Sequence, residues 1–229
     1  MSNSFVIADT HFSHRNSWEK FKLPNGDPLR PFTSNEEMDE TMVERWNAKV
    51  KPGDHVYHLG DVGISKSSIE ICKRLNGKKR LVRGNHDHYD DKVYLEAGFQ
   101  KLLGVRVFVD KFILSHIPLH PDCITDRFRA CVHGHLHANE VMRPSSHAFS
   151  YVDPVTFEMS VRDKNDHRRV LSKTGLQEPD PRYLCVSVEH TNYEPLSFEE
   201  VEERIQKRWD DTGYSPPVNA GWGNGSGPG

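Results

Sequence analysis

Seven side chains that could bind metal fall in five short motifs, and each motif follows an apolar run. The motifs are Asp9-Thr10-His11, Gly60-Asp61, Gly84-Asn85-His86-Asp87, His116 and Gly134-His135-Leu136-His137. Carboxylate, amide and imidazole groups bind hard or borderline divalent cations, and no thiolate stands among these candidate ligands. Because the motifs are widely spaced, no single loop can hold them. They must converge from several strand ends, which predicts one folded site that holds two metal ions.

A binuclear site needs a ligand that bridges two cations, and a carboxylate does this well because it has charge and two oxygens. Asp61 is the candidate, since the preceding Gly60 would let the backbone approach closely. Asn85 offers a neutral oxygen, which keeps the site positive enough to attract a phosphate. This nitrogen and oxygen donor set suits Mn, Fe, Zn or Ni better than Ca. Two such ions about 3.5–4 Å apart can activate a hydroxide and clamp phosphoryl oxygens.

The first and last motifs share a spacing of two residues. Asp9 and His11 should project in the same direction if their segment continues as a strand, and the same holds for His135 and His137.

The elements that position these residues are short apolar runs that read as buried strands. The runs are 5–8, 55–59, 80–83, 112–115 and 131–132. The candidate ligands therefore stand where strands end, which is where open sheets present ligand sites.

Three helices are predicted from capping boxes, in which a serine stands three residues before a glutamate. The pairs are Ser34 with Glu37, Ser67 with Glu70, and Ser197 with Glu200. Strand–helix alternation in the first half predicts parallel βαβ units. Later, 107–109 and 112–114 flank Asp110-Lys111 as a tight hairpin, and 183–188 reads as another strand. Because the first strands should be parallel and the later ones antiparallel, we expect an α/β fold with two sheets face to face and helices outside.

In order and content, these five motifs resemble those of the calcineurin-like metallophosphoesterases, over residues 9–137. The resemblance implies an αββα four-layer sandwich with two mixed β-sheets. It implies that one metal is held by Asp9, His11, Asp61 and His137, and the other by Asp61, Asn85, His116 and His135. It gives His86 the role of general acid, opposite a metal-bridging hydroxide that attacks phosphorus. The runs 9–16 and 187–196 look like those of a small, stand-alone bacterial and phage branch.

The chain departs from some branches of that superfamily. Its protein phosphatases carry an Asp-Arg pair shortly after the Gly-Asp motif, whereas Val62-Gly-Ile-Ser65 follows here. This disfavours a protein phosphatase and leaves the orienting partner of His86 open, with Asp87 the nearest candidate. Lariat-debranching relatives carry Cys in the first motif, and the intact Asp9 disfavours that role.

The remaining histidines have simpler interpretations. We expect His58 to be a core or supporting residue and His133 to support the site rather than bind metal. His14 and Asn16 are either polar loop residues or substrate contacts. His120, His147 and His167 are taken as surface residues.

Composition suits one large domain, which we place at 1–210 with 138–182 as an inserted loop or small lid and 211–229 as a disordered Gly/Pro-rich tail. The four cysteines lack metal-ligand spacing and are read as buried reduced thiols. No signal peptide or membrane-spanning run is evident, so we expect a cytoplasmic protein without a membrane partner.

The predicted function is metal-dependent hydrolysis of a phosphoester, with Mn the first choice of metal and Fe, Zn, Ni or Mg as alternatives. Phosphodiesters or nucleotides are the favoured substrates. A phosphomonoesterase, a nuclease or a silent scaffold of the same fold are the alternatives. The net charge of −3 does not indicate nucleic acid, although Arg162, Lys164, Arg168 and Arg169 could form a local basic face. The sequence does not predict the oligomeric state.

Overall fold

A computed structural model describes residues 2–108, 110–124, 128–144, 148–152, 155, 159–163, 170–171 and 177–216. Two compact units are present, one from Met1–Asn139 with Pro181–Gly229 and the other from Glu140–Asp180. The predicted tail lies outside the described residues from 217 onward, while residues 211 and 212 belong to the last helix. The domain boundaries that we expected from the sequence stay a prediction.

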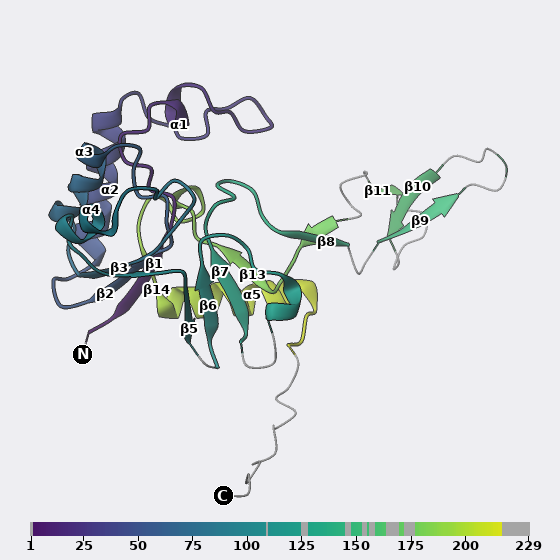
Figure 1. The fold of residues 1–229 in the computed structure, drawn as a ribbon. Helices are drawn as coiled ribbons and strands as arrows, with labels where there is room; N and C mark the ends of the chain where they lie inside the picture. The colour runs from purple at the N-terminus through teal and green to yellow at the C-terminus, as the bar shows by residue number, and fades with distance from the viewer. Residues whose placement is uncertain are drawn as a thin grey trace, which may run out of the picture. The chain divides into compact units, whose positions relative to one another are not determined.

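The first sheet of the larger unit has five strands in the order β14-β1-β2-β3-β4 (Figure 1). Its strands are β1 (Ser4–Ile7), β2 (His55–His58), β3 (Lys78–Val82), β4 (Phe99–Leu103) and β14 (Leu196–Ser197). Strands β1 to β4 are parallel, and β14 pairs with β1 in the antiparallel sense. Parallel pairing brings the carboxyl ends of β1, β2 and β3 to one edge, where the first three motifs begin.

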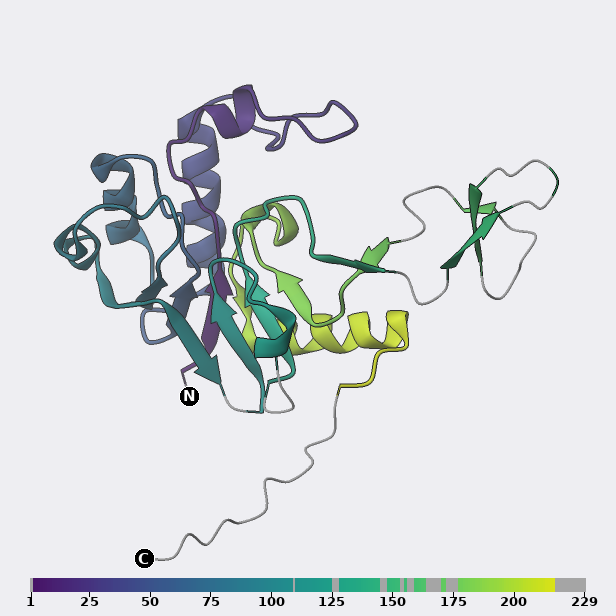
Figure 2. The ribbon, with the colours of Figure 1, turned by 45° about the vertical axis from the view of Figure 1, so that its right-hand side comes forward.

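The second sheet has four strands in the order β13-β7-β6-β5 (Figure 2). They are β5 (Val105–Phe108), β6 (Phe112–Ser115), β7 (Ala130–His133) and β13 (Tyr183–Cys185). The expectation that the later strands are antiparallel is wrong for most of this sheet, because β6, β7 and β13 pair in parallel. Only the β5–β6 hairpin is antiparallel. Asp110, which lies between these two strands, takes a left-handed φ of 62°.

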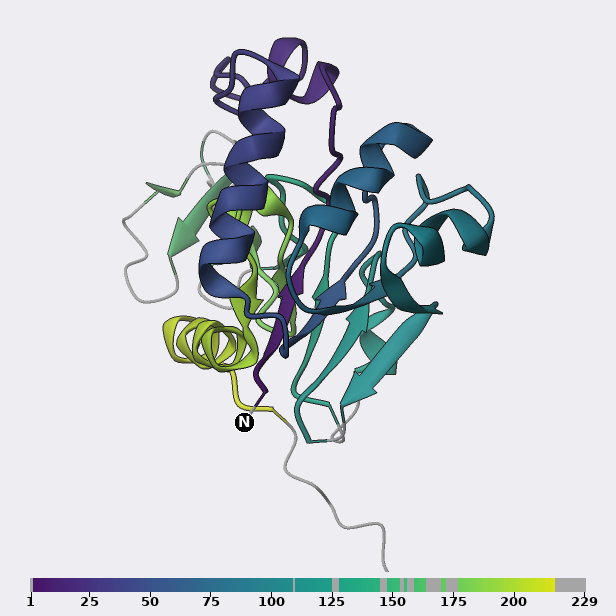
Figure 3. The ribbon, with the colours of Figure 1, turned by 90° about the vertical axis from the view of Figure 1, so that its left-hand side faces the viewer.

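Three helices cover one face of the first sheet (Figure 3). They are α2 (Asn35–Lys49), α3 (Lys66–Ile69), which continues as the 3₁₀ helix η1 (Glu70–Arg74), and α4 (Asp91–Glu96). Helix α5 (Phe198–Thr212) packs against β1, β13 and β14. The remaining short helices of this unit are α1 (Asn16–Glu19), η2 (Pro121–Cys123) and η4 (Val188–His190).

The helix caps agree with the sequence in two cases and differ in one. Ser34 and Ser197 each accept a hydrogen bond from the backbone three residues later, and Glu200 completes the box at Ser197. The predicted box at Ser34 is incomplete, because Glu37 accepts from the amide and hydroxyl of Thr33 instead. The predicted cap at Ser67 is wrong. Ser65 caps α3 and forms its box with Ser68. The hydroxyl of Ser68 accepts the hydrogen bond from the backbone amide of Ser65 that a glutamate usually accepts in such a box.

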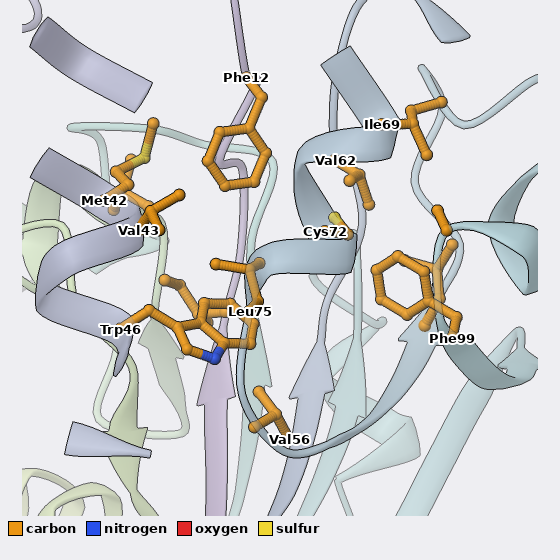
Figure 4. Packing of buried hydrophobic residues seen from close by; sticks show 14 of the residues in the cluster. Phe12, Met42, Val43, Trp46, Val56, Val62, Ile69, Cys72, Leu75 and Phe99 are labelled. Carbon is orange, nitrogen blue, oxygen red and sulfur yellow. The ribbon is translucent and has the colours of Figure 1, made fainter. Parts of the chain in front are cut away.

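Strand β1 alternates between two cores. Phe5 and Ile7 join the cluster beneath the helices, which includes Trp46 of α2 (Figure 4). Val6 and Ala8 join the cluster between the two sheets, which also takes the inner face of α5. This period of two gives an α/β sandwich of two sheets packed face to face, as expected.

The described residues of the smaller unit form strands and their connections. Strand β8 (Met142–Pro144) pairs with β12 (Gln177–Pro179), and β9 (Ala148–Val152), β10 (Met159–Asp163) and β11 (Val170–Leu171) form a three-stranded antiparallel sheet. Its role as a lid stays a prediction.

No helix among the described residues is long and apolar enough to cross a membrane.

Trp46 is 1% exposed, and its indole N–H donates to the carbonyl of Asn76. We expect Trp46→Ala to lower the free energy of unfolding by about 3–5 kcal/mol, through lost burial and the cavity left behind. Urea denaturation measures this change. Leu95→Ala is the control, because Leu95 is 48% exposed and its loss should cost under about 0.5 kcal/mol. Equal effects of the two substitutions would contradict the layer assignment.

Candidate metal centre

Five of the seven candidate ligands stand on left-handed backbone. Their φ angles are 57° at Asp9, 43° at His11, 58° at Asp61, 70° at His135 and 51° at His137. Side chains two apart therefore converge through tight left-handed turns, and our expectation of continued strand alternation is wrong. Such conformations cost about 1–3 kcal/mol each and persist only where surrounding contacts enforce them.

Main-chain hydrogen bonds continue between these turns after the strands end. The amide of Asp9 donates to the carbonyl of Gly60 at 3.0 Å, and the amide of His11 donates to the carbonyl of Asp61 at 3.0 Å. The turns after β1 and β2 are thus joined to each other, and this holds the first two motifs in register.

Glycines in the motifs permit this close approach. Gly60 has a φ of 92°, and a Cβ there would lie 2.4 Å from the amide nitrogen of Gly84. A Cβ at Gly134 would lie 2.4 Å from Oδ2 of Asp9. No real Cβ tolerates such contacts, so a larger residue at either position would push the strand ends apart.

The candidate ligands gather in two groups. The groups are Asp9 with His11 and His137, and Asp61 with His116 and His135, with one donor atom of each residue within 4.8 Å of the others in its group. Asn85 joins the second group, since its Oδ1 lies 2.9 Å from Nε2 of His116 and 2.9 Å from Nδ1 of His135. All seven residues therefore lie at one edge of the larger unit.

Asp61 lies between the two groups. Its Oδ2 is 3.5 Å from Nε2 of His11 and 3.5 Å from Nε2 of His116. Its Oδ1 accepts a hydrogen bond of 2.9 Å from the amide of His86. One carboxylate oxygen thus faces both groups, as a bridging ligand must.

The donor set fits divalent metal ions. His116 donates from Nδ1 to the carbonyl of Leu59 at 2.7 Å, which leaves its Nε2 unprotonated as a ligand atom. Nε2 of His116 is 3.2 Å from Nδ1 of His135. This distance lies between the ~3.0 Å of octahedral and the ~3.4 Å of tetrahedral neighbouring ligands with ~2.1 Å bonds. In Asp9, Oδ1 is buried without a hydrogen-bond partner among the described residues. Burial raises the pKa of this carboxyl to about 6, and a cation beside it would stabilise the ionised form.

His58 supports the first two motifs from inside the core. Its Nδ1 accepts from the amide of Gly60 at 3.2 Å, so its Nε2 donates to the hydroxyl of Thr10 at 2.9 Å. That hydroxyl in turn donates to the carbonyl of Val62. Burial lowers the pKa of His58 to about 3, so it stays neutral. The structure agrees with the supporting role expected from the sequence.

Asp87 does not orient His86, which corrects our nearest candidate for that role. Its carboxylate accepts three backbone amides, from Asp61 at 2.8 Å, Val62 at 3.1 Å and Gly84 at 2.9 Å. Both oxygens are therefore engaged by the turns themselves. The His86 ring is exposed, and its centroid lies 5.4 Å from that of His11.

Two further histidines flank the donors. His133 donates from Nδ1 to the carbonyl of Gly134, and it belongs to neither ligand group. Burial lowers its pKa to about 4. His14 is half-buried, with its ring 5.4 Å from that of His11 and in edge contact with Phe21. Asn16 begins α1, whose first residues follow this loop.

Some predicted residues lie elsewhere. Of the four residues expected to form a basic face, only Arg162 is among the described residues. His147 and His167 also lie outside them, while His120 is 72% exposed in its side chain. All four cysteines are free, but Cys123 is exposed, which corrects the expectation that all are buried.

The sequence interpretation missed several supporting residues. Ser187 donates from its hydroxyl to Oδ2 of Asp9 at 2.6 Å. Glu189 and Arg30 form a buried ion pair beside the first ligand group. Arg30 carries no recognisable spacing to the motifs, whereas Ser187 and Glu189 lie in the run 187–196, whose resemblance to the bacterial and phage branch did not show which of its residues support the site.

Comparisons with known proteins show the family to which the chain is related. A model of the calcineurin-like phosphoesterase superfamily domain matches residues 3–154. The uncharacterized protein MJ1445 of Methanocaldococcus jannaschii is 30% identical over 90% of this chain and 93% of its own length. The Gene 66 protein of Mycobacterium phage L5 is 33% identical over 38% of this chain and 41% of its own length. A crystal structure of the protein of unknown function AQ665 from Aquifex aeolicus has a TM-score of 0.55 at 24% identity, covering 89% of this chain and all of its own, and is similar in fold.

Gly134→Ala should weaken the binding of Mn²⁺ about tenfold or more, because the added methyl group displaces the carboxylate of Asp9. Isothermal titration calorimetry measures the affinity. Gly104→Ala is the matched control, since a Cβ there meets nothing within 4 Å. If Gly134→Ala bound Mn²⁺ as tightly as the parent, the carboxylate of Asp9 would be able to shift without loss of metal affinity, which would contradict the prediction.

Proposed function

This chain belongs to the calcineurin-like phosphoesterase superfamily, and from that membership we propose that it is a phosphoesterase that depends on two divalent metal ions. The observation that carries the proposal is the position of Asp61, whose Oδ2 lies 3.5 Å from a ligand nitrogen of each group. We propose that Asp9, His11, Asp61 and His137 hold one ion, and that Asp61, Asn85, His116 and His135 hold the other.

The metal ions and the residues of the chain would make different contributions to the reaction. Bound divalent ions lower the pKa of a water molecule and stabilise negative charge on phosphoryl oxygens. The seven proposed ligands would hold the two cations at one edge of the larger unit. Mn is the proposed first choice of metal, with Fe, Zn, Ni or Mg as alternatives, because the mixed nitrogen and oxygen donors accept all of them.

His86 is the proposed general acid that protonates the leaving oxygen. The ring of His86 is exposed, so a substrate that enters from solvent can contact it. The backbone amide of His86 donates a hydrogen bond to the carboxylate of Asp61, the proposed bridging ligand. The proton would move from an imidazole nitrogen of His86 to the oxygen that departs from phosphorus. This places the acid beside the ligands without making it one of them.

Phosphodiesters or nucleotides are the proposed substrates. Two aromatic pairs stand near the candidate ligands. His14, whose ring lies 5.4 Å from that of His11, pairs with Phe21, and His88, which follows Asn85 by three residues, pairs with Tyr89 at a centroid distance of 4.5 Å. Phe21 is 46% exposed, and exposed aromatic faces can stack on nucleobases. We propose the cytoplasm as the compartment, because free cysteines suit a reducing environment.

His86→Ala should keep both metals and lose about 10²–10⁴-fold in turnover, the contribution typical of a general acid. Bis-p-nitrophenyl phosphate and p-nitrophenyl phosphate with Mn²⁺ are the substrates, and metal content is measured in parallel. His120→Ala is the control, because the side chain of this histidine is 72% exposed and belongs to neither ligand group. Parental turnover in His86→Ala would remove the acid role. No turnover of either substrate by the chain with two metals bound would remove the enzyme assignment.

Asp61→Asn should lose metal as well as activity, since an amide brings no charge and bridges two cations poorly. The measurement is metal content after dialysis, by elemental analysis. Retention of two ions per chain in Asp61→Asn would contradict the bridging role.

A further inference from the structure

An ion pair stands beside the first ligand group and is buried almost completely. Nε of Arg30 lies 2.8 Å from Oε1 of Glu189, and the two side chains are 0% and 4% exposed. Arg30 belongs to the segment before α2, and Glu189 lies in η4, 159 residues further along. The two residues therefore tie the beginning of the chain to its last third.

Arg30 is also bound to the main chain of the first motif. One of its terminal nitrogens donates to the carbonyl of Asp9 at 2.6 Å and the other donates to the carbonyl of Thr10 at 2.8 Å. Asp9 has a left-handed φ of 57°. The planar guanidinium thus holds two successive carbonyls of a strained turn, which a lysine could not do with the same geometry.

Glu189 is bound to a candidate ligand. Its Oε1 also accepts from Nδ1 of His137 at 3.1 Å, which leaves Nε2 of that ring free to bind a cation. The carboxylate of Glu189 thus contacts both the Arg30 guanidinium and the imidazole of His137, and the hydrogen bond at Nδ1 sets the tautomer of the histidine.

Stability alone does not account for the pair. Buried ion pairs often contribute nothing net, because the loss of hydration offsets the attraction. In addition, Oε2 of Glu189 is buried without a hydrogen-bond partner among the described residues, which is itself unfavourable. What the pair does achieve is a fixed relation between Asp9 and His137, two residues that face each other across the first ligand group.

We propose that Arg30 and Glu189 are positioning residues that pre-organise the first metal position, with Arg30 holding the turn at Asp9 and Glu189 orienting the ring of His137. This inference rests on the proposed function, because it assumes that the first group binds a metal ion. The pair touches ligands of the first group only, so its loss should act on one of the two ions.

The first experiment is titration of Mn²⁺ into metal-free Glu189→Gln, followed by calorimetry and by electron paramagnetic resonance. We expect the affinity for one Mn²⁺ to fall about 10–100-fold, as for other partners of metal-binding histidines, while the second ion binds as in the parent. The spin-coupled signal of the Mn pair should be lost at stoichiometric metal. Glu40→Gln is the matched control, because Glu40 forms a surface ion pair with Arg74.

A second variant tests whether Arg30 and Glu189 position the ligands or only neutralise each other's buried charge. Arg30→Met with Glu189→Leu removes both charges together, so it leaves no unpaired buried ion that would prevent folding. We expect the melting temperature of its metal-free form to stay near that of the parent, while the first Mn²⁺ still binds weakly. Parental binding of both ions in this double variant, or an equal loss at both positions in Glu189→Gln, would overturn the inference. If the parent itself binds no Mn²⁺, the proposed function fails instead.

Discussion

The rest of the structure depends on the contact between the Asp61 carboxylate and the two groups of donors on either side of it. One oxygen faces an imidazole of each group at 3.5 Å, and the other holds the amide of His86. This arrangement requires the ends of β1, β2 and β3 to meet within van der Waals distance. Gly60 and Gly84 make that approach possible, since a side chain at either position would collide with the neighbouring turn. Parallel pairing of the strands is what brings the three ends to one edge.

Gathering these donors is unfavourable in itself, and the fold offsets the cost with buried polar contacts. Left-handed φ angles at five candidate ligands store strain, and groups removed from water lose hydration. Asp87 accepts three backbone amides of the turns, and His58 joins Gly60 to Thr10. The two apolar clusters on either face of the first sheet contribute the hydrophobic stabilisation that offsets the strain and the lost hydration at the site.

Much of this could be predicted from local patterns. The strands after which the motifs stand, the helix caps at Ser34 and Ser197, and the convergence of seven donors follow from apolar runs and residue types read over a few positions. The cap at Ser65 could not be predicted so easily, because two serines form a box that usually contains a glutamate. The left-handed backbone at Asp9 and His135 also escaped prediction, since strand spacing and tight turns can bring the same side chains together. Parallel pairing of β6 with β7 depends on tertiary packing.

The residues that support the site were the hardest to predict, and the reason is physical. A ligand stands next to the strand that carries it, so its motif is short and ordered. Arg30 and Glu189 act on Asp9 and His137 across long stretches of chain, and their contacts are set by how loops fold back over the strand ends. The sequence around Arg30 does not distinguish it from a surface charge, and the family-like run 187–196 around Glu189 does not show that this residue contacts a ligand. Burial is what distinguishes them: an arginine and a glutamate that the fold keeps from water must satisfy each other and their surroundings. Here those surroundings are the main chain and the side chain of candidate metal ligands, so their placement is explained by the site and not by the sheet.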